Sequence, residues 1–473
     1  MNSRPARKIT TAIVGVSAAA LLLSACGGST TTPTASSAGS AAGGSSAPAS
    51  SVAGATGPQP AESGWCDAVK AQYPNLSGSV GVYSTIVSPE DTPYIEAYKD
   101  FTTCTGVTVN YEGSKEFEAQ VGVRVASGNP PDLGIFPQPG LLSQIVNNTG
   151  AVKPLPDFVK TNAQKYFPSD WLNYGTVNGI SFGIPNNADF KSLVWYSPKT
   201  FADKGYTVPT TWDELTALTD QIAATGEKPW CIGIASGEAT GWQITDWLEE
   251  YVLRYAGPEV YDQWVSHDVK FADAPIADAL AKVGALLKDP KYVNGGFGDV
   301  ATIASTQFND VSTPLLNGQC TFAREAANFD SNFKGKTIGP DGDINAFYFP
   351  PANDQFGTTV LGGGTFYAAF ADRPEVQAFE YYLTTPEYAN ARAKAGSWIS
   401  SNLGLQASSV ESAVQQEALK TLQSTDTTFR FDASDLMPAP VGSDAEWKQF
   451  TAWITGQDDA TTLANIDAAW PTS

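Results

Sequence analysis

Residues 79–111, SVGVYSTIVSPEDTPYIEAYKDFTTCTGVTVNY, decide the fold class of this chain. Residues 79–83 and 107–111 are short runs rich in β-branched and aromatic residues, typical of buried strands. Ser88, followed by a proline and two acids, predicts a helix start, and the apolar residues of 94–101 recur at helical spacing. Two strands joined by a crossover helix lie parallel in one sheet, so this stretch predicts a β-α-β unit.

The same alternation of strands and helices continues along the chain. Thr211 with Glu214 forms a capping box that opens one helix, and Thr240 with Gln243 predicts a second box. Further strands are expected at 132–136 and 230–234, and further helices at 141–146, 375–383, 415–422 and 445–454. About 410 residues follow residue 63, which is too many for one ordinary core. The sequence therefore predicts an α/β protein with two sheets in two lobes.

The N-terminus has the pattern of a secretory signal. Basic residues at positions 4, 7 and 8 precede an apolar run to Leu23, and Leu23-Ser24-Ala25-Cys26 follows. The run is short for a membrane-spanning helix, which needs about 20 residues, although such a helix is the alternative. Leu-Ser-Ala-Cys resembles the bacterial lipobox, in which the cysteine is acylated. We therefore expect residues 1–25 to be a lipoprotein signal peptide and Cys26 to carry lipid.

Residues 26–64 are almost entirely Ser, Thr, Ala, Gly and Pro. Such a composition cannot bury enough apolar area to offset the entropy lost on ordering. We expect this segment to be a flexible tether between a lipid at Cys26 and the folded part. That places the folded part at the extracytoplasmic face of the cell membrane.

The overall charge argues against several classes of partner. The chain has a formal net charge of −21, and 16% of its residues are charged. It should be repelled by nucleic acid and by anionic lipid head groups. Neither is expected to be a partner, apart from the membrane contact made by the lipid anchor.

Cysteine usage fits an oxidising compartment. If Cys26 carries lipid, Cys66, Cys104, Cys231 and Cys320 remain, and four cysteines allow three pairings. Two lie early in the folded part and two in its middle, so we expect bridges within a lobe, Cys66–Cys104 and Cys231–Cys320. The chain has no Cys-x-x-Cys motif and no Cys/His cluster, so neither a metal nor a cofactor is expected.

The order of several motifs resembles the family 1 bacterial extracellular solute-binding proteins, the maltose-binding type. The likeness covers about residues 79–471 and is closest to the α-glucoside-binding group of carbohydrate ABC importers. The motifs that carry it are Tyr111-Glu112-Gly113, Gly128-Asn129-Pro130-Pro131-Asp132, Phe136-Pro137-Gln138-Pro139-Gly140, Lys191-Ser192-Leu193-Val194-Trp195-Tyr196, Pro209-Thr210-Thr211-Trp212-Asp213-Glu214-Leu215, Gly241-Trp242, Leu361-Gly362-Gly363-Gly364 and Phe429-Arg430-Phe431-Asp432-Ala433-Ser434-Asp435.

The resemblance implies a two-lobed periplasmic-binding-protein-like fold of type II, with a hinge and an interlobe cleft. Lobe 1 is expected at 65–187 and 361–400, lobe 2 at 188–350 and 404–473, and hinge crossings at 351–360 and 401–403. It also implies a monomer that captures a carbohydrate, either an α-glucoside or an oligosaccharide. This monomer would deliver the sugar to the membrane subunits of an ABC permease, without catalysis.

A sugar needs aromatic rings for its C–H face and polar side chains for its hydroxyls. Trp242, near a helix start, and Asp246, one turn later, are candidates for the second lobe, although a buried Trp with a solvated Asp is the alternative. Trp195, Tyr196 and Trp212 lie within strand or capped-helix patterns and are assigned to packing.

Further candidates rest on strand ends and on the resemblance. Glu112 and Gln138 end strands in the first lobe, and Gly364 and Thr365 follow a glycine run that either approaches the ligand or forms a plain turn. Three more candidates come from the second lobe: Arg324, Glu325 and Trp447. A surface ion pair is the alternative for Arg324 and Glu325, and core packing for Trp447.

Two residues depart from the α-glucoside group. That group has Asp after the glycine triplet, where this chain has Thr365, and it usually has Arg-Gln where this chain has Arg324-Glu325. Two altered polar groups in one cleft would change which arrangement of sugar hydroxyls the protein binds. The sequence therefore leaves the identity of the sugar open.

Two other classes of protein compete with a sugar-binding protein. An enzyme would have to work almost without histidine, since His267 is the only one, but a glycosidase needs only two carboxylates. A binding protein for a non-sugar solute is the second alternative. Incubation with oligosaccharides separates an enzyme from a binding protein.

Overall fold

The computed structural model describes residues 64–295, 300–352, 354–422, 424 and 426–471. The expected signal peptide, Cys26 and nearly all of the expected tether lie outside these residues. Among the residues described, no helix is both long and apolar enough to cross a membrane.

The β-α-β unit predicted from residues 79–111 is present. β1 (Ser79–Ser84) pairs in parallel with β2 (Thr108–Gly113), and α2 (Thr92–Ala97) and α3 (Lys99–Thr105) connect them. The helix start expected at Ser88 was wrong, because residues 88–91 form turns and the first helical residue is Thr92.

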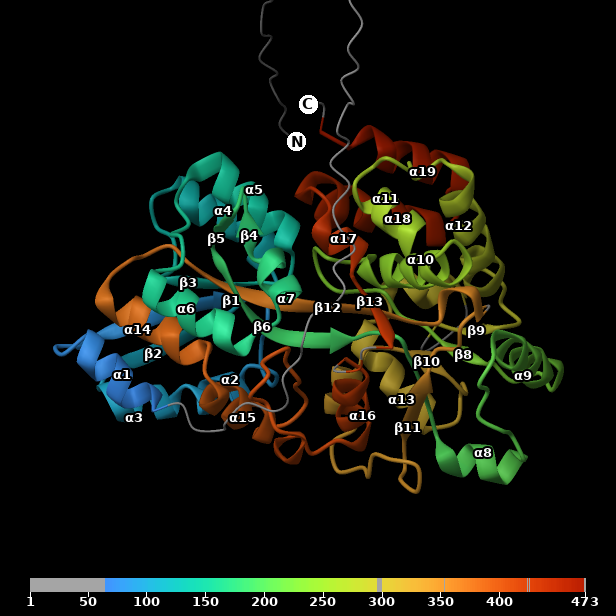
Figure 1. The fold of residues 1–473 in the computed structure, drawn as a ribbon. Helices are drawn as coiled ribbons and strands as arrows, with labels where there is room; N and C mark the ends of the chain where they lie inside the picture. The colour runs from blue at the N-terminus through green and yellow to red at the C-terminus, as the bar shows by residue number, and fades with distance from the viewer. Residues whose placement is uncertain (1–63, 296–299, 353, 423, 425, 472–473) are drawn as a thin grey trace, which may run out of the picture. The chain divides into compact units, whose positions relative to one another are not determined.

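A six-stranded sheet continues from this unit in the order β13-β12-β3-β1-β2, with β6 also paired to β12. β3 (Leu133–Phe136) runs parallel to β1 and antiparallel to β12 (Thr358–Ala369). β12 is long enough to pair with β3 near its end and with β13 (Thr427–Phe431) near its start. Figure 1 shows β12 and β6 (Gly183–Phe190) running from the elements around β1 toward those around α10.

Seven helices and a small hairpin accompany the β1–β3 part of this sheet. The hairpin consists of β4 (Thr176–Val177) and β5 (Ile180–Ser181). The helices are α1 (Trp65–Gln72), α4 (Phe117–Ala126), α5 (Pro139–Thr149), α6 (Asp157–Tyr166), α7 (Ser169–Tyr174), α14 (Pro374–Leu383) and α15 (Pro386–Lys394).

The second group of elements contains two small sheets. β7 (Leu193–Tyr196) lies between β10 (Ala323–Arg324) and β11 (Asn345–Tyr348), and β8 (Trp230–Cys231) pairs with β9 (Val293–Asn294). The strand expected at 230–234 is therefore shorter than predicted. The helices here are α8 (Pro198–Lys204), α9 (Trp212–Ala224), α10 (Trp242–Tyr255), α11 (Pro258–Val265), α12 (Ala274–Leu287), α13 (Ser312–Leu316), α16 (Ala413–Leu422), α17 (Ala433–Leu436), α18 (Glu446–Ile454) and α19 (Asp459–Ala468).

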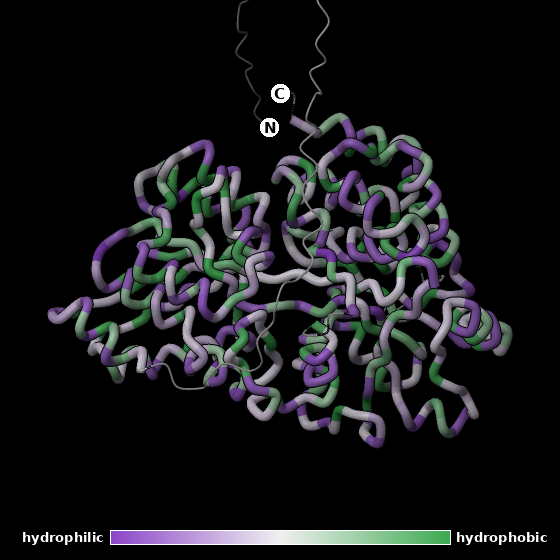
Figure 2. The backbone as a smooth tube through the Cα atoms, viewed as in Figure 1, coloured by the Kyte–Doolittle hydropathy of each residue, from purple (hydrophilic) through white to green (hydrophobic). Residues whose placement is uncertain are grey.

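Helix α10 lies at the centre of the second group. Every residue from Gln243 to Arg254 is buried, and α10 packs on α12, α18 and α11. Trp195 is fully buried, and Trp212 makes edge contacts with Tyr251 and Phe349, so these two rings pack as predicted. Along the tube in Figure 2, hydrophobic and hydrophilic residues alternate in short stretches, as expected for elements with one buried face.

Only one of the two predicted capping boxes forms. Thr211 and Glu214 cap α9 reciprocally. At α10 the N-cap is Gly241, with φ of 113°, and the Thr240 hydroxyl instead donates to the carbonyl of Gly237 at 2.7 Å. The second box was therefore wrong.

Both disulfides have the expected partners. Cys66–Cys104 joins α1 to α3, and Cys231–Cys320 joins β8 to the segment before β10. Each bridge joins two elements of the same group: Cys66–Cys104 in the first group and Cys231–Cys320 in the second. Neither bridge links one group to the other.

Candidate ligand-binding cavity

A cavity of about 1070 Å³ lies where β6 and β12 pass between the two groups of elements. Its walls come from both groups: Glu118 and Gln138 from the first, and Trp242 and Glu325 from the second. The floor includes Asp189 and Lys191 at the end of β6. A site built in this way can contact one ligand from two sides.

Aromatic rings line much of this cavity. Trp242 is half-buried, and its ring meets the ring of Phe308 edge-on, with centroids 5.0 Å apart. Trp447 of α18 and Trp398 also line the cavity, and both are buried. Indole and phenyl faces provide flat apolar surfaces that pack against C–H groups.

The position of Trp242 follows from the packing of Gly241. A side-chain carbon at Gly241 would lie 2.2 Å from the carbonyl oxygen of Trp447, so only glycine allows α10 to begin this close to α18. The positive φ of Gly241 turns the chain into the helix at this point. The close contact brings the two tryptophans to the same wall of the cavity.

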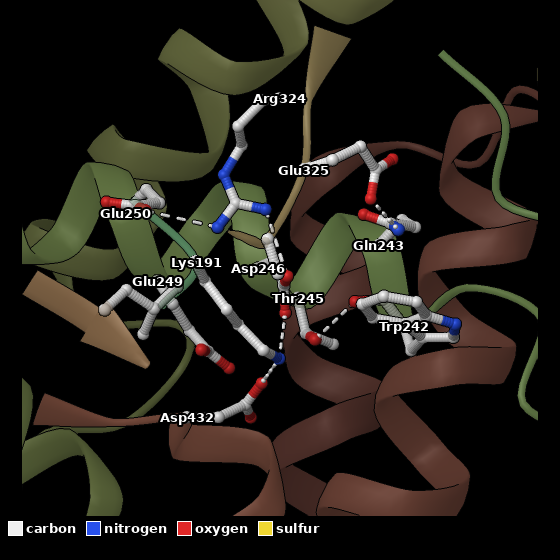
Figure 3. Close-up of polar contacts among 12 residues, drawn as sticks. Lys191, Trp242, Gln243, Thr245, Asp246, Glu249, Glu250, Arg324, Glu325 and Asp432 are labelled. Atoms are coloured by element: carbon white, nitrogen blue, oxygen red, sulfur yellow. Dashed lines mark hydrogen bonds and ion pairs between the residues drawn. The ribbon is translucent and has the colours of Figure 1, made fainter. Parts of the chain in front are cut away.

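A network of buried charges adjoins the floor and includes Lys191 (Figure 3). The Lys191 ammonium donates to Asp246 at 2.9 Å and to Asp432 at 2.6 Å. The Arg324 guanidinium donates to Asp246 at 3.0 Å and to Glu250 at 3.2 Å. These residues come from α10, the β6–β7 link, β10 and the end of β13, so the network joins four segments that are distant in sequence.

The network shifts the pKa values of its members. Burial disfavours the charge on Lys191, but the carboxylates of Asp246 and Asp432 outweigh burial and raise the pKa of Lys191. Burial likewise opposes the charge on Asp432, yet Lys191 and hydrogen bonds from Ser434 and the Asp435 N–H lower the pKa of Asp432 to about 2. Lys191 and Asp432 are therefore an ion pair at neutral pH.

The pKa of Glu325 shifts in the other direction from that of Asp432, because Glu325 forms no ion pair with any described residue. Burial raises the pKa of Glu325 to about 8, although its carboxyl accepts a 2.9 Å hydrogen bond from Gln243. At neutral pH most of the population is protonated and presents a hydroxyl donor as well as an acceptor.

Asp246, Glu249 and Asp432 have oxygens within 4.8 Å of one another, a spacing that metal ligands can have. The Lys191 ammonium already bonds to two of the three acids. A protein cation thus occupies oxygens that a metal ion would need, so this cluster is not assigned as a metal site.

Several lining residues have polar atoms without a hydrogen-bond partner among the described residues. They are Oε1 of Gln138 and of Gln415, Oδ1 of Asp330, Nε of Arg392, and Nε1 of Trp398 and of Trp447. Each of these side chains is at most 5% exposed. Because an unpaired buried polar atom costs free energy, these atoms are suited to hydrogen bonds with a ligand.

Comparison with known proteins decides the family. The family model described as "Bacterial extracellular solute-binding protein" matches residues 87–390. The chain is 36% identical to the alpha-glucosides-binding periplasmic protein AglE of Rhizobium meliloti, over 79% of this chain and 82% of that protein. This chain belongs to the bacterial extracellular solute-binding proteins.

Two further relatives extend the comparison. The osmoprotective compounds-binding protein GgtB of Synechocystis is 33% identical over 85% of this solute-binding protein and 95% of its own length. The solved structure of the bacterial solute receptor AcbH has a TM-score of 0.71, at 18% identity over 83% of this chain and 98% of that one. The two-lobed maltose-binding-type fold predicted from the sequence is confirmed.

Six of the nine predicted ligand residues line the cavity of this solute-binding protein: Gln138, Trp242, Glu325, Gly364, Thr365 and Trp447. Asp246 and Arg324 do not line it. Both are 2% exposed and belong to the network under Lys191, so they are neither a solvated acid nor a surface pair.

The placement of Glu112 in the cleft was wrong. Glu112 is exposed on β2, does not line the cavity, and forms a bidentate ion pair with Arg124 of α4. Neighbouring residues of a strand point to opposite faces. Tyr111 donates to the carbonyl of Ile86, whereas Glu112 turns to the other side.

Gly364 lies in a strand rather than in a turn. A side-chain carbon there would be 2.4 Å from the carbonyl oxygen of Asn187 in β6, so the glycine permits close approach of β6 to β12. The Thr365 hydroxyl donates to Asn187 Oδ1 at 2.6 Å and accepts from Asn186 at 2.8 Å.

Sequence reasoning missed Asp189, Lys191, Asp435, Arg392 and Trp398 as lining residues. Lys191 was visible as a single cation between a predicted hinge and an apolar strand. The acid pair of Asp432 and Asp435 was visible just after a β-rich run. Arg392 lies inside a helix pattern, where no local signal marks a residue that faces a cavity.

Proposed function

We propose that this protein captures a carbohydrate in the cavity and delivers it to the membrane subunits of an ABC importer. The observation that carries this proposal is the combination of indole rings and unpartnered polar atoms on walls from both groups of elements. A sugar ring has an apolar face and a rim of hydroxyls, and these walls complement both. Membership of the solute-binding family supports the transport role.

An α-glucoside or an oligosaccharide is the proposed ligand. AglE, at 36% identity, is named for α-glucosides, and the cavity volume is slightly above the range of drug-sized ligand sites. Since the Thr365 hydroxyl is bonded to β6, an Asp at this position in relatives would alter β6 contacts as well as ligand contacts.

A thermal-shift panel tests this proposal. It should include maltose, trehalose, sucrose, raffinose, glucose and glycerol glucosides. A ligand at 100 times its Kd adds about 2.7 kcal/mol to stability, which is readily measured as a rise in melting temperature. No shift with any sugar would contradict the proposal.

A small osmoprotective solute is a second candidate, favoured by the identity to GgtB over 95% of that protein. Glycine betaine and proline, tested beside the panel, represent this class. A shift with these compounds but not with the di- and trisaccharides would select this candidate.

A secreted carbohydrate-active enzyme was the other alternative. The relatives are binding proteins, which supports a non-catalytic role. Chromatography of the oligosaccharides after incubation with the protein should show no cleavage products.

We also propose the anchor at Cys26, supported by the Leu23-Ser24-Ala25-Cys26 motif. Cys26→Ala should leave the protein unacylated and free of the membrane, as detected by mass spectrometry and cell fractionation. A protein that stays in the membrane fraction without lipid would instead have a membrane-spanning N-terminal helix.

The lobe boundaries remain a proposal: lobe 1 at 65–187 and 361–400, and lobe 2 at 188–350 and 404–473. β6 and β12 run between the two groups of elements and are the natural hinge strands. Closure around a ligand requires better contacts in the closed than in the open state, and cavity walls from both groups allow this. The protein is proposed to act as a monomer.

A further inference from the structure

The cavity floor contains two carboxylates that the buried network does not neutralise. Asp189 lies on β6 directly opposite Gly363 of β12. Asp435 follows β13 on the other edge of β12, and its Oδ2 would lie 3.8 Å from a side-chain carbon placed at Gly363. Both acids line the cavity and are half-buried.

The nearest cation is already committed to other acids. Lys191 Nζ also lies 3.8 Å from that position at Gly363, but it donates to Asp246 at 2.9 Å and Asp432 at 2.6 Å. Among the described residues, neither Asp189 nor Asp435 has a cation within ion-pair distance. The floor therefore carries more negative than positive charge when its acids are ionised.

The adjoining wall provides groups suited to a cationic sugar. The Trp242 ring lies beside the floor, with its centroid 5.3 Å from Lys191 Nζ, so it already faces one ammonium. Nε1 of Trp447 and Oε1 of Gln138 line the same cavity, are buried, and lack a partner among the described residues. These atoms can bind hydroxyls while the acids bind a charge.

We propose that the cavity selects a glycoside carrying a protonated amine, with the ammonium bound between Asp189 and Asp435 above Gly363. This inference rests on the proposed carbohydrate-binding function and narrows its ligand class. Charge-assisted hydrogen bonds are about twice as strong as neutral ones, which gives the preference its physical basis.

Binding of an ammonium should also release protons. Burial raises the pKa of Asp189 and, more strongly, that of Asp435, where the neighbouring Asp432 adds to the effect. Lys191 acts in the opposite direction, whereas Asp246 raises the pKa of both acids. A carboxyl that is protonated in the free protein must lose its proton to pair with an ammonium. Affinity for the amine should therefore rise with pH until the ligand amine itself deprotonates.

Calorimetric titration with matched pairs of sugars tests the proposal: glucose with glucosamine, and trehalose with trehalosamine. In whichever pair binds, the amine should bind at least tenfold more tightly. The Asp189→Asn, Asp435→Asn double variant should bring the two affinities to within about threefold. Glu90→Gln, at an exposed acid that also lines the cavity, should leave the ratio unchanged.

Proton release is a second readout that needs no variant. Titration of the unaltered protein in buffers of different ionisation enthalpy should show protons released with the amine and none with its neutral partner. Equal or tighter binding of the neutral sugar, or a ratio that survives the double variant, would overturn the inference while leaving the proposed function intact. If no sugar of the pairs or of the thermal-shift panel binds, the proposed function itself fails.

Discussion

The indole of Trp242 is half-buried at the start of α10 and lines the cavity beside Phe308. Trp242→Ala should weaken sugar binding by about 2 kcal/mol, or about 30-fold in Kd, because buried aromatic anchors dominate binding energy. Calorimetry measures the loss, and the melting temperature without ligand should change little.

Trp212→Ala is the matched control. Trp212 also begins a helix and is half-buried, but it contacts Tyr251 and Phe349 and does not line the cavity. This variant should lower stability and leave affinity unchanged. If Trp242→Ala instead behaved like this control, Trp242 would be a core residue.

Lys191 is the cation of the buried network, so its removal should be costly. Lys191→Met leaves Asp246 and Asp432 without their shared ammonium and should destabilise the protein by about 3–5 kcal/mol in urea unfolding at pH 7. Lys199→Met, which breaks an exposed pair with Asp203, should cost less than about 1 kcal/mol.

The stability cost of Lys191→Met should depend on pH. In the unaltered protein the pKa of Asp432 is lowered to about 2, so its stabilising contribution is present above the unfolded value of 3.8 and is lost as pH falls toward 2. Without Lys191 the buried carboxylates should take up protons at higher pH. The cost of Lys191→Met should therefore be smaller at pH 4 than at pH 7, and an equal cost at both would contradict the ion-pair account.

At this scale the sequence predicts residue types better than residue positions. Trp242, Glu325 and Gln138 were found because they stand at helix starts or strand ends, where side chains can reach a cleft. Asp246 was misread because a turn of α10 that looks amphipathic in sequence is buried on all sides by α12, α18 and the strand segments. Such burial depends on elements distant in the chain.

Helix α14 contains a buried acid, Glu380, that forms no ion pair with any residue the structure describes. Burial raises the pKa of Glu380 to about 8, so the folded protein holds a proton that the unfolded chain loses near 4.5. Stability should fall as pH rises from about 5 to 8, by up to about 4 kcal/mol from this group. Glu380→Gln should remove this group's share of the fall in stability, as measured by urea unfolding at both pH values.

Glu375→Gln on the same helix is the control, since Glu375 is half-buried and pairs with Arg373 at 3.4 Å. This variant should leave the difference in unfolding free energy between pH 5 and pH 8 unchanged. If both variants gave the same pH profile, the proton would not reside on Glu380.

Element boundaries were predictable where local chemistry decides them. The box of Thr211 and Glu214 forms because both side chains reach the first turn of α9 without competition. At α10 the contact between Gly241 and Trp447 fixes the start of the helix, and the hydroxyl of Thr240 is used in the preceding turn. A tertiary contact thus overrides a valid local signal.

For the molecule as a whole, the disulfides are the clearest covalent feature. Peptide mapping without reduction should recover Cys66–Cys104 and Cys231–Cys320. Replacing both Cys231 and Cys320 by Ala should cost about 2–5 kcal/mol. Because both bridges lie within a group of elements, sugar affinity of the folded variant should stay within a few-fold. A large loss of affinity would indicate that the Cys231–Cys320 bridge affects how the cavity closes around the sugar.

The two-lobed architecture followed from length and from alternating elements, but the cavity did not. Its floor requires β6, β12 and β13 to lie side by side, although residues 183–190 and 427–431 are far apart in the chain. Pairing over such distances leaves no local trace, which is why Asp189 and Asp435 were not predicted.

The central claim is that a carbohydrate binds between the tryptophan wall and the acidic floor. It is tested most directly by calorimetric titration of the best sugar from the thermal-shift panel into the unaltered protein and into the Trp242→Ala, Trp447→Ala double variant. The account predicts one binding site per chain and a loss of affinity of at least about 100-fold in a double variant that remains folded. Equal affinity in the two proteins would contradict it and place the ligand elsewhere.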